Sequence, residues 1–312
     1  MSISVIKQKR RGMTAANRQD NLYLWAMMIP VLILIFIFSY VPMYGILIAF
    51  QKYRPGKPFL GPSVRWVGLK HFADFIQSEY FFRILFNTIR LNLYQLVFGF
   101  TTPILFALLL DQITNSKYRK FVQTVSYMPH FISMVVVAGM VCSFITSDGL
   151  ITQLLTKFGL PAQNYRLSSA AFTPIYTLTT VWKGFGWGSI LYMATISGIS
   201  PTLYEAAKLD GANRWQQVWH ITLPGIKPVI AINLIMQIGG LLRSNSDLIL
   251  LLYQPATYDV ADVLGTYIYR MGIESGQYSL TTAAGLFMSL IGFILTFCSN
   301  KFSDWLTGYA LW

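Results

Sequence analysis

Six long apolar segments, separated by short polar stretches, dominate the pattern of residues along the chain. They cover residues 22–50, 84–110, 121–145, 172–196, 229–252 and 280–300. A helix that crosses a bilayer needs about 20 predominantly apolar residues, and each segment reaches that length. The apolar runs are continuous, whereas the strands of a membrane barrel would alternate apolar and polar residues. The pattern therefore predicts an all-α integral membrane protein with six transmembrane helices.

The composition agrees with this prediction and excludes other classes of protein. Of the 312 residues, 54% are hydrophobic and only 12% are charged, against about 25% charged in an ordinary soluble domain. So few charges cannot cover the surface of a soluble fold, which excludes a disordered protein and an ordinary cytosolic enzyme. The two cysteines, Cys142 and Cys298, lie within apolar segments and are expected to act as small buried hydrophobes.

The distribution of basic residues predicts the orientation in the membrane. Six crossings place both termini on one side, and residues 1–21 form a tail with five Lys or Arg. Lys and Arg accumulate on the cytoplasmic side of spans, and the first span usually sets the orientation. Both termini are therefore expected in the cytoplasm, with residues 22–312 forming a six-span membrane domain. The net charge of +12 is attributed to this topology, and no nucleic acid is expected as a partner.

One loop weakens the charge bias. Twelve Lys and Arg fall on the expected cytoplasmic side and nine on the other. Six of these nine crowd the loop after the first span, namely Lys52, Arg54, Lys57, Arg65, Lys70 and Arg83.

The sequence lacks the residue patterns that common enzyme classes need. HExxH, GxSxG and a Walker A phosphate loop are all absent from it, so no catalytic residue and no metal are assigned to this chain. The glycines Gly184, Gly186 and Gly188 lie inside an apolar segment, where small residues let helices approach closely. They are expected to serve packing and not phosphate binding. Energy for uphill transport would have to come from an ion gradient or from a partner protein.

The connection between the fourth and fifth segments, at about residues 197–228, carries the most specific pattern. Its members are Pro201, Glu205, Ala206, Ala207, Gly211, Leu223 and Pro224. The first proline suits the first turn of a helix, the Glu-Ala-Ala run favours a helix, and the glycine supplies a left-handed stop. The Leu-Pro pair is expected to end the connection before the next span. We therefore predict a short amphipathic helix on the cytoplasmic face, followed by a tight turn.

This pattern resembles the signature of permease subunits of binding-protein-dependent ABC importers. The signature is EAA, three residues, G, nine residues, I, one residue and LP, and every fixed position is matched. The stretches at 122–131 and 182–187 look like the carbohydrate-uptake branch of that family. The stretch at 253–263 and the ending at Leu311 and Trp312 are similar to LplB-like permeases of polysaccharide or oligosaccharide uptake.

The resemblance implies a fold, a set of partners and a role for the connection. It implies the type I ABC importer permease fold in a bacterial inner membrane, with an oligosaccharide as solute. The implied partners are a second permease subunit, expected to give a heterodimer, two ABC ATPase subunits that hold ATP and magnesium, and an extracytoplasmic solute-binding protein. No cofactor is implied for this chain. The implied ATPase-coupling residues are Glu205, Ala206, Ala207, Gly211, Leu223 and Pro224.

Polar residues inside the apolar segments are candidates for the solute pathway, because such residues generally face a cavity or a partner helix. They recur at helical spacing in three segments, and they combine hydrogen-bonding groups with aromatic faces that suit sugars. The candidates are Thr88, Asn92, Gln95, Tyr176, Thr180, Lys183, Trp187, Asn233, Gln237, Arg243, Ser244 and Asp247. Each stripe has an alternative interpretation as interhelical contacts, and Arg243 with Asp247 as a structural ion pair.

Two further functional alternatives stay open at this point. An ABC permease could carry an amino acid or a peptide instead of a sugar. A secondary transporter driven by an ion gradient would act without an ATPase, but it predicts inverted repeats and leaves the EAA pattern unexplained.

Overall fold

The computed structural model describes residues 15–308, except 243–245, together with residues 310 and 311. The first helices are α1 (Ala15–Ile35), which continues through Phe36–Tyr40 and Val41–Phe50, then α2 (Lys70–Ile76), α3 (Phe81–Tyr94), a π-helical turn (Gln95–Gly99), α4 (Phe100–Asp111), α5 (Ser116–Phe131), α6 (Met134–Phe144) and α7 (Leu150–Lys157). They are followed by Tyr165–Leu167, α8 (Ser169–Ser197), α9 (Pro201–Leu209), α10 (Arg214–Gln217), a π-helical turn (Val218–Thr222), α11 (Leu223–Gly239) and α12 (Ser246–Leu252). The last are Pro255–Thr257, α13 (Tyr258–Ala261), α14 (Leu264–Tyr267), Ile268–Glu274 and α15 (Tyr278–Thr307).

The apolar helices broadly follow the predicted spans. By length and hydropathy, four helical runs within the described residues could cross a membrane: Asn21–Phe50, Phe81–Asp111, Arg214–Gly239 and Tyr278–Trp305. The pair α5 and α6 makes a fifth if it counts as one span. Helix α8, with 29 residues, is also long enough, but its threonines and glycines make it less apolar than the others.

The third predicted span is broken. Residues 121–145 were expected to form one helix, whereas α5 and α6 meet at an angle of 95°. The backbone of Ile132 and Ser133 is extended, and the Ser133 hydroxyl caps α6 by accepting a hydrogen bond from the Val136 amide at 3.3 Å. The two helices together are long and apolar enough to count as one span, so hydropathy alone does not detect the break.

The prediction of a fifth span over 229–252 is wrong at both ends. The helix already begins at Arg214, runs through Leu223 and Pro224, and ends at Gly239. The Leu-Pro pair therefore opens α11 instead of ending the connection, with the π-helical turn Val218–Thr222 immediately before it. Asp247 belongs to the separate helix α12, so it does not continue the face of α11. Arg243 and Ser244 lie outside the described residues.

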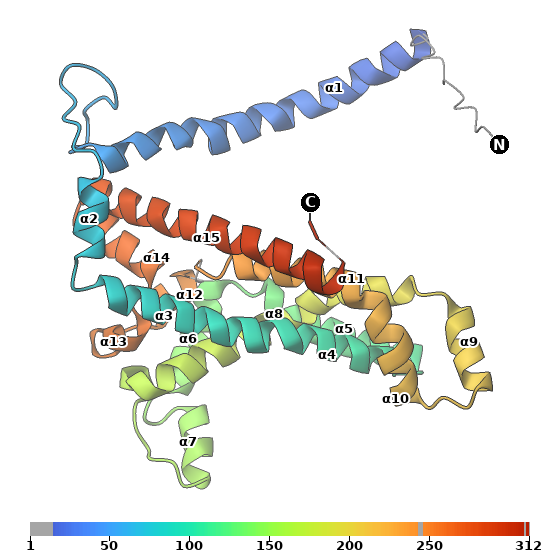
Figure 1. The fold of residues 1–312 in the computed structure, drawn as a ribbon. Coiled ribbons are helices and arrows are strands. Elements are labelled where there is room, and N and C mark those ends of the chain that lie inside the picture. Colours follow the sequence, from blue (N-terminus) through green and yellow to red (C-terminus); the bar gives the residue numbers. More distant parts are fainter. Residues whose placement is uncertain (1–14, 243–245, 309, 312) are drawn as a thin grey trace.

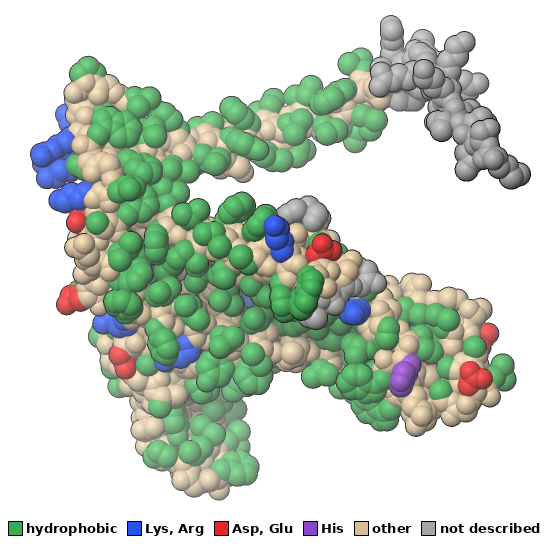
Figure 2. Space-filling view, in the orientation of Figure 1, with side chains coloured by type: hydrophobic (Ala, Val, Ile, Leu, Met, Phe, Trp, Pro, Cys, Tyr) green, Lys and Arg blue, Asp and Glu red, His purple; other side chains and the backbone are tan. Residues whose placement is uncertain are grey.

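The bundle has two distinct ends (Figure 1). Helix α9 projects at one end, while α2, α13 and the loop at 51–69 lie at the opposite end. Helix α8 runs through the body against α4, α5 and α11, and α15 packs on α11. Helix α1 stands away from this body, and every side chain in residues 21–40 is exposed, which Figure 2 shows as an apolar arm.

Glycines bring α8 close to its neighbours, as predicted. A β-carbon on Gly186 would collide with the backbone carbonyl of Ser126 in α5. One on Gly188 would lie 3.1 Å from the Pro103 ring in α4. The third glycine of the cluster, Gly184, has no atom within 4 Å of that position. Two of the three glycines therefore set the distances between the helices that surround the centre of the bundle.

We expect Gly186→Ala to destabilise the protein by about 1–3 kcal/mol, the usual cost of overpacking. Gly184→Ala is the matched control, and it should be neutral or slightly stabilising because alanine favours a helix. The free energy of unfolding of the purified protein in detergent, measured by denaturant titration, separates the two variants. Equal stability of both would show that α5 and α8 are not in close contact at Gly186.

Candidate functional site: a coupling helix, a polar cavity and two polar anchors

Helix α9 forms where the EAA pattern predicts it. Pro201 occupies its first turn, where a missing amide hydrogen has no consequence. It ends in a Schellman motif: Gly211 has φ +79°, the Ala212 amide donates to the Ala207 carbonyl at 2.8 Å, and the Gly211 amide donates to the Lys208 carbonyl at 3.1 Å. The predicted left-handed stop at Gly211 is therefore confirmed.

Two contacts fix α9 and its turn to the bundle. The Tyr204 hydroxyl lies 3.0 Å from the Thr222 hydroxyl, just before α11. The Arg214 guanidinium donates to the Gln112 carbonyl after α4 at 3.2 Å. Burial raises the pKa of the Tyr204 phenol, so this group stays protonated and keeps its hydrogen at physiological pH.

The remaining surface of α9 is open. Glu205, Ala206 and Gly211 are exposed, while Ala207 is half-buried against the bundle. Leu209, at the end of the helix, is 90% exposed. The helix is thus held from one side and presents small and apolar residues on the other.

A polar cavity of about 230 Å³ lies between α4, α8 and α11. It is lined by four of the predicted pathway residues, namely Gln95, Thr180, Asn233 and Gln237. The Thr180 hydroxyl donates to the Gln95 side-chain oxygen at 2.6 Å, which joins two of the three walls. The glycines Gly99, Gly184 and Gly188 also line it. The structure therefore brings together hydrogen-bonding side chains from three segments that are far apart in the sequence.

Other predicted pathway residues lie elsewhere. Three of them are buried, namely Thr88, Asn92 and Tyr176. The Thr88 hydroxyl accepts a hydrogen bond from the Leu264 amide at 3.2 Å. The side-chain amide of Asn92 donates to the Thr88 carbonyl at 2.8 Å. Asp247 is exposed at the start of α12. None of these four lines the cavity between α4, α8 and α11.

Lys183 occupies the break between α5 and α6. Its ammonium group donates to the carbonyls of Pro129, His130 and Ile132 at 3.2, 2.8 and 2.5 Å. The last carbonyls of a helix have no partner within it, and the extended segment that follows provides a backbone donor only to Pro129, from the Ile132 amide at 3.3 Å. One turn further along α8, the Trp187 ring stacks on His130 with a centroid separation of 4.5 Å and an angle of 2°. Lys183 and Trp187, which were predicted to line the solute pathway, thus join α8 to the break between α5 and α6.

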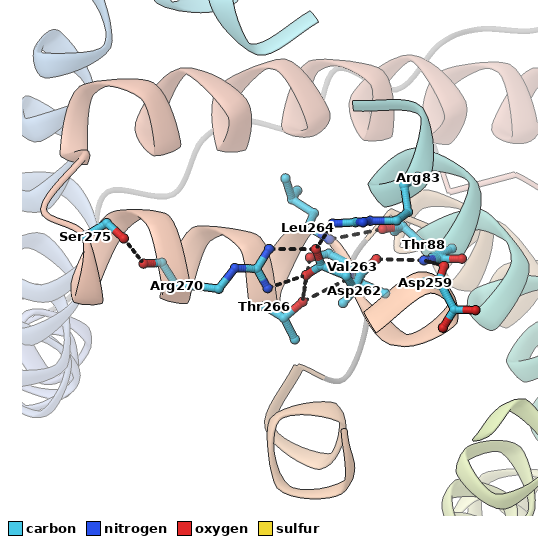
Figure 3. Close-up of polar contacts among 10 residues, drawn as sticks. Arg83, Thr88, Asp259, Asp262, Val263, Leu264, Thr266, Arg270 and Ser275 are labelled. Atoms are coloured by element: carbon cyan, nitrogen blue, oxygen red, sulfur yellow. Dashed lines mark hydrogen bonds and ion pairs between the residues drawn. The ribbon is translucent and has the colours of Figure 1, made fainter. Parts of the chain in front are cut away.

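A second anchor, which the sequence did not reveal, lies at the end of the bundle opposite α9 (Figure 3). The fully buried Asp262 carboxylate accepts hydrogen bonds from Arg270 at 2.7 and 3.0 Å and from Arg83 at 3.2 Å. The hydrogen bond to Asp262 raises the pKa of the Arg270 guanidinium. The Asn87 amide donates to the carbonyls of Asp259 and Asp262 at 2.9 and 3.1 Å. These contacts fix the segment 259–264 onto α3.

The family to which residues 99–308 belong identifies the class of protein. Residues 99–308 match the family of binding-protein-dependent transport system inner membrane components, and the chain belongs to this family. It is therefore an ABC transporter permease, a transport subunit of the inner membrane and not an enzyme.

Individual relatives resemble the chain over nearly its whole length. It is 42% identical over 296 residues to the polygalacturonan/rhamnogalacturonan transport system permease protein YteP of Bacillus subtilis (strain 168), which covers 95% of this chain and 91% of YteP. It is 39% identical over 287 residues to protein LplB of the same bacterium, covering 92% and 89% of the two chains. The predicted similarity to LplB-like permeases is confirmed.

The fold also matches a solved transporter. A bacterial ABC transporter that imports the acidic polysaccharide alginate gives a TM-score of 0.84 at 41% identity, over 94% of this chain and 98% of that one. A bacterial alginate ABC transporter in complex with an alginate pentasaccharide-bound periplasmic protein gives 0.85 at 39% identity, over 96% of this chain and 100% of that one. The predicted type I permease fold is therefore confirmed.

We expect Lys183→Met to lower the free energy of unfolding by about 2–3 kcal/mol, because it leaves three carbonyls without their charged donor. Lys183→Arg keeps a donor at this place and should recover most of the loss. Lys157→Met, which removes an exposed lysine from α7, is the control for loss of charge. A Met variant at 183 that unfolds at the same denaturant concentration as the parent would show that the break does not depend on Lys183.

Proposed function

We propose that this chain forms one half of the translocation pathway of an ATP-driven importer for oligosaccharides. The observation that carries the proposal is the connection of the exposed helix α9, through Tyr204 and Thr222, to the helix that lines the polar cavity. Such a connection can transmit movement of a partner protein to the pathway. The identity of 42% to a polygalacturonan/rhamnogalacturonan permease supports a carbohydrate as the solute.

The proposed partners follow from the same features. Of the two ABC ATPase subunits, which bind ATP and magnesium, one contacts Glu205, Ala206 and Ala207 on α9 and Gly211 in the turn after it. Leu223 and Pro224 carry the movement into α11. A second, similar permease subunit completes the pathway as a heterodimer. The exposed apolar side chains of α1 suit a helix that meets lipid and this second subunit. The periplasmic protein bound to the alginate transporter supports a solute-binding protein as a further partner.

The proposed orientation places α9 and both termini in the cytoplasm. The ends of α1 and α15 that lead to the chain termini lie on the same side of the bundle as α9, which supports this arrangement (Figure 1). The loop at 51–69 and the Asp262 anchor then face the extracytoplasmic side. The solute passes along the cavity at Gln95, Thr180, Asn233 and Gln237, where amide and hydroxyl groups offer both donors and acceptors to sugar hydroxyls.

The assembly is tested by purifying the tagged chain in mild detergent and identifying its companions. We expect an ABC ATPase and a second permease to co-purify.

Two substitutions test the role of α9 and its turn: Glu205→Lys reverses a surface charge, and Gly211→Val places a branched side chain at positive φ. Each should reduce uptake roughly tenfold or more while the protein stays in the membrane. Gly211→Asn tolerates this conformation and should retain uptake.

Other outcomes would favour the alternatives. A chain that purifies alone and exchanges solute in response to an ion gradient would be a secondary transporter. ATP-dependent uptake of amino acids or peptides, without uptake of oligosaccharides, would keep the ABC mechanism and overturn the proposed solute.

The cavity is tested by substitutions that remove its amide groups. Gln95→Ala and Gln237→Ala should raise the KM for oligosaccharide uptake several-fold, because a lost hydrogen bond to a neutral partner is worth about 1 kcal/mol. Gln153→Ala, on the exposed surface of α7, is the matched control and should leave the KM unchanged. An unaltered KM in both cavity variants would mean that these side chains only join the helices.

A further inference from the structure

The loop at 51–69 concentrates positive charge at the end of the bundle opposite α9. Figure 2 shows this charge as a patch between α1 and α2. Within the loop, a cavity of about 230 Å³ is lined by Lys52, Arg54, Lys57 and Arg65, together with Tyr53. No Asp or Glu is among the residues that line it. The cavity is therefore a concave and strongly cationic site.

The backbone holds these cations on a fixed frame. The Lys52 amide donates to the Arg65 carbonyl at 2.9 Å, which brings the two ends of the loop together. Gln51 is only 1% exposed, and its side-chain amide donates to the Phe59 carbonyl at 2.8 Å. The Ser279 hydroxyl of α15 donates to the Gln51 carbonyl at 2.7 Å and accepts from the Tyr53 amide at 3.1 Å. The site is thus built onto the bundle before any ligand arrives.

The four cations are not used to stabilise the fold. All four residues are exposed, and within the part of the chain that the structure describes none of their side chains forms an ion pair or a hydrogen bond. Arg83 and Arg270 behave differently, because both pair with Asp262. Membrane insertion does not explain the cluster either, since Lys and Arg favour the cytoplasmic side and this loop faces the other side in the proposed orientation.

We propose that this cavity binds a carboxylate-bearing sugar residue, and that the imported oligosaccharide is therefore acidic. This inference rests on the proposed importer function. The planar guanidinium groups of Arg54 and Arg65 match the geometry of a carboxylate, and the Tyr53 ring offers a flat face to a sugar. A space of 230 Å³ corresponds to about eight liquid water molecules, which is the scale of one sugar ring.

An acidic protein surface fits this site less well. A specific protein interface covers about 800 Å² on each partner and is built around an apolar centre, whereas this site is small and concave, and all of its charged lining residues are cationic. The alginate transporter of similar structure imports an acidic polysaccharide, which agrees with an anionic ligand. A cationic entrance would also raise the local concentration of an acidic chain at low salt.

The proposal is tested by measuring the binding of trigalacturonate to the assembled transporter. The transporter is placed in nanodiscs of neutral phosphatidylcholine, and the binding protein is left out. We expect saturable binding that weakens as salt is added. The uncharged methyl ester of trigalacturonate should bind roughly tenfold more weakly or worse, because it lacks the charge-assisted hydrogen bonds. Arg54→Gln/Arg65→Gln should cause a similar loss, whereas the control Lys70→Gln/Lys157→Gln, which removes two exposed cations outside the cavity, should not.

Three results would overturn the proposal. The acid and its ester could bind equally, or the double arginine variant could bind trigalacturonate like the parent. The variant could also retain trigalacturonate binding while it loses the binding protein or vesicles containing anionic phosphatidylglycerol, which would assign the site to docking or to lipid headgroups. In each case co-purification of the ATPase and ATP-dependent uptake of a neutral oligosaccharide would remain, so the importer function would stand. Conversely, a chain that binds trigalacturonate but recruits no ATPase would overturn only the importer function.

Discussion

The hydrogen bonds from Lys183 to three carbonyls at the end of α5 are the interaction on which the centre of the bundle depends. In a bilayer no water is available to a broken helix, so every backbone polar group must be satisfied by protein. A charged side chain at the same depth is also costly unless it finds partners. Lys183 therefore satisfies the carbonyls that the break leaves open, and these carbonyls in turn compensate the charge of its ammonium group. Because Lys183 and Thr180 lie on the same helix, the contact that satisfies the break also positions one wall of the polar cavity.

The need to satisfy every backbone polar group also explains the contacts at the end of the bundle opposite α9. The short helices α13 and α14 leave backbone groups that a continuous helix would have satisfied, and Asn87 and Thr88 of α3 bind these groups directly. Asp262 then holds Arg83 and Arg270 against the segment. A buried carboxylate is favourable only with such compensation. Helix α9 needs no anchor of this kind for its end, because its turn at Gly211 is exposed and closes through its own backbone.

The sequence predicted those features that depend on one continuous helix or on local backbone chemistry. Thr180 on α8, and Asn233 with Gln237 on α11, keep their helical spacing and meet at the cavity. The turn at Gly211 follows from the conformational freedom of glycine. Features that depend on a break or on distant residues were not predictable. Asp247 was placed on the face of α11 because the apolar run continues past Gly239 and Gly240, where that helix ends, and glycines are frequent inside membrane helices. Asp262 contacts Arg83, which is 179 residues away, so no local pattern points to the pair.

The contact of Tyr204 with Thr222 and the contacts of Lys183 also determine which helices can move. Thr222, which contacts Tyr204 of α9, precedes Asn233 by eleven residues within the run Arg214–Gly239, a distance of about 16 Å along a helix. A displacement of α9 would therefore reach the cavity along a single rigid element. Helix α8, in contrast, is tied to α5 by Lys183 and by the ring stack of Trp187 on His130. Movement at α9 would thus shift the wall formed by Asn233 and Gln237 relative to the wall formed by Thr180. In the proposed importer, this relative movement converts an event at the cytoplasmic end into a change of the pathway.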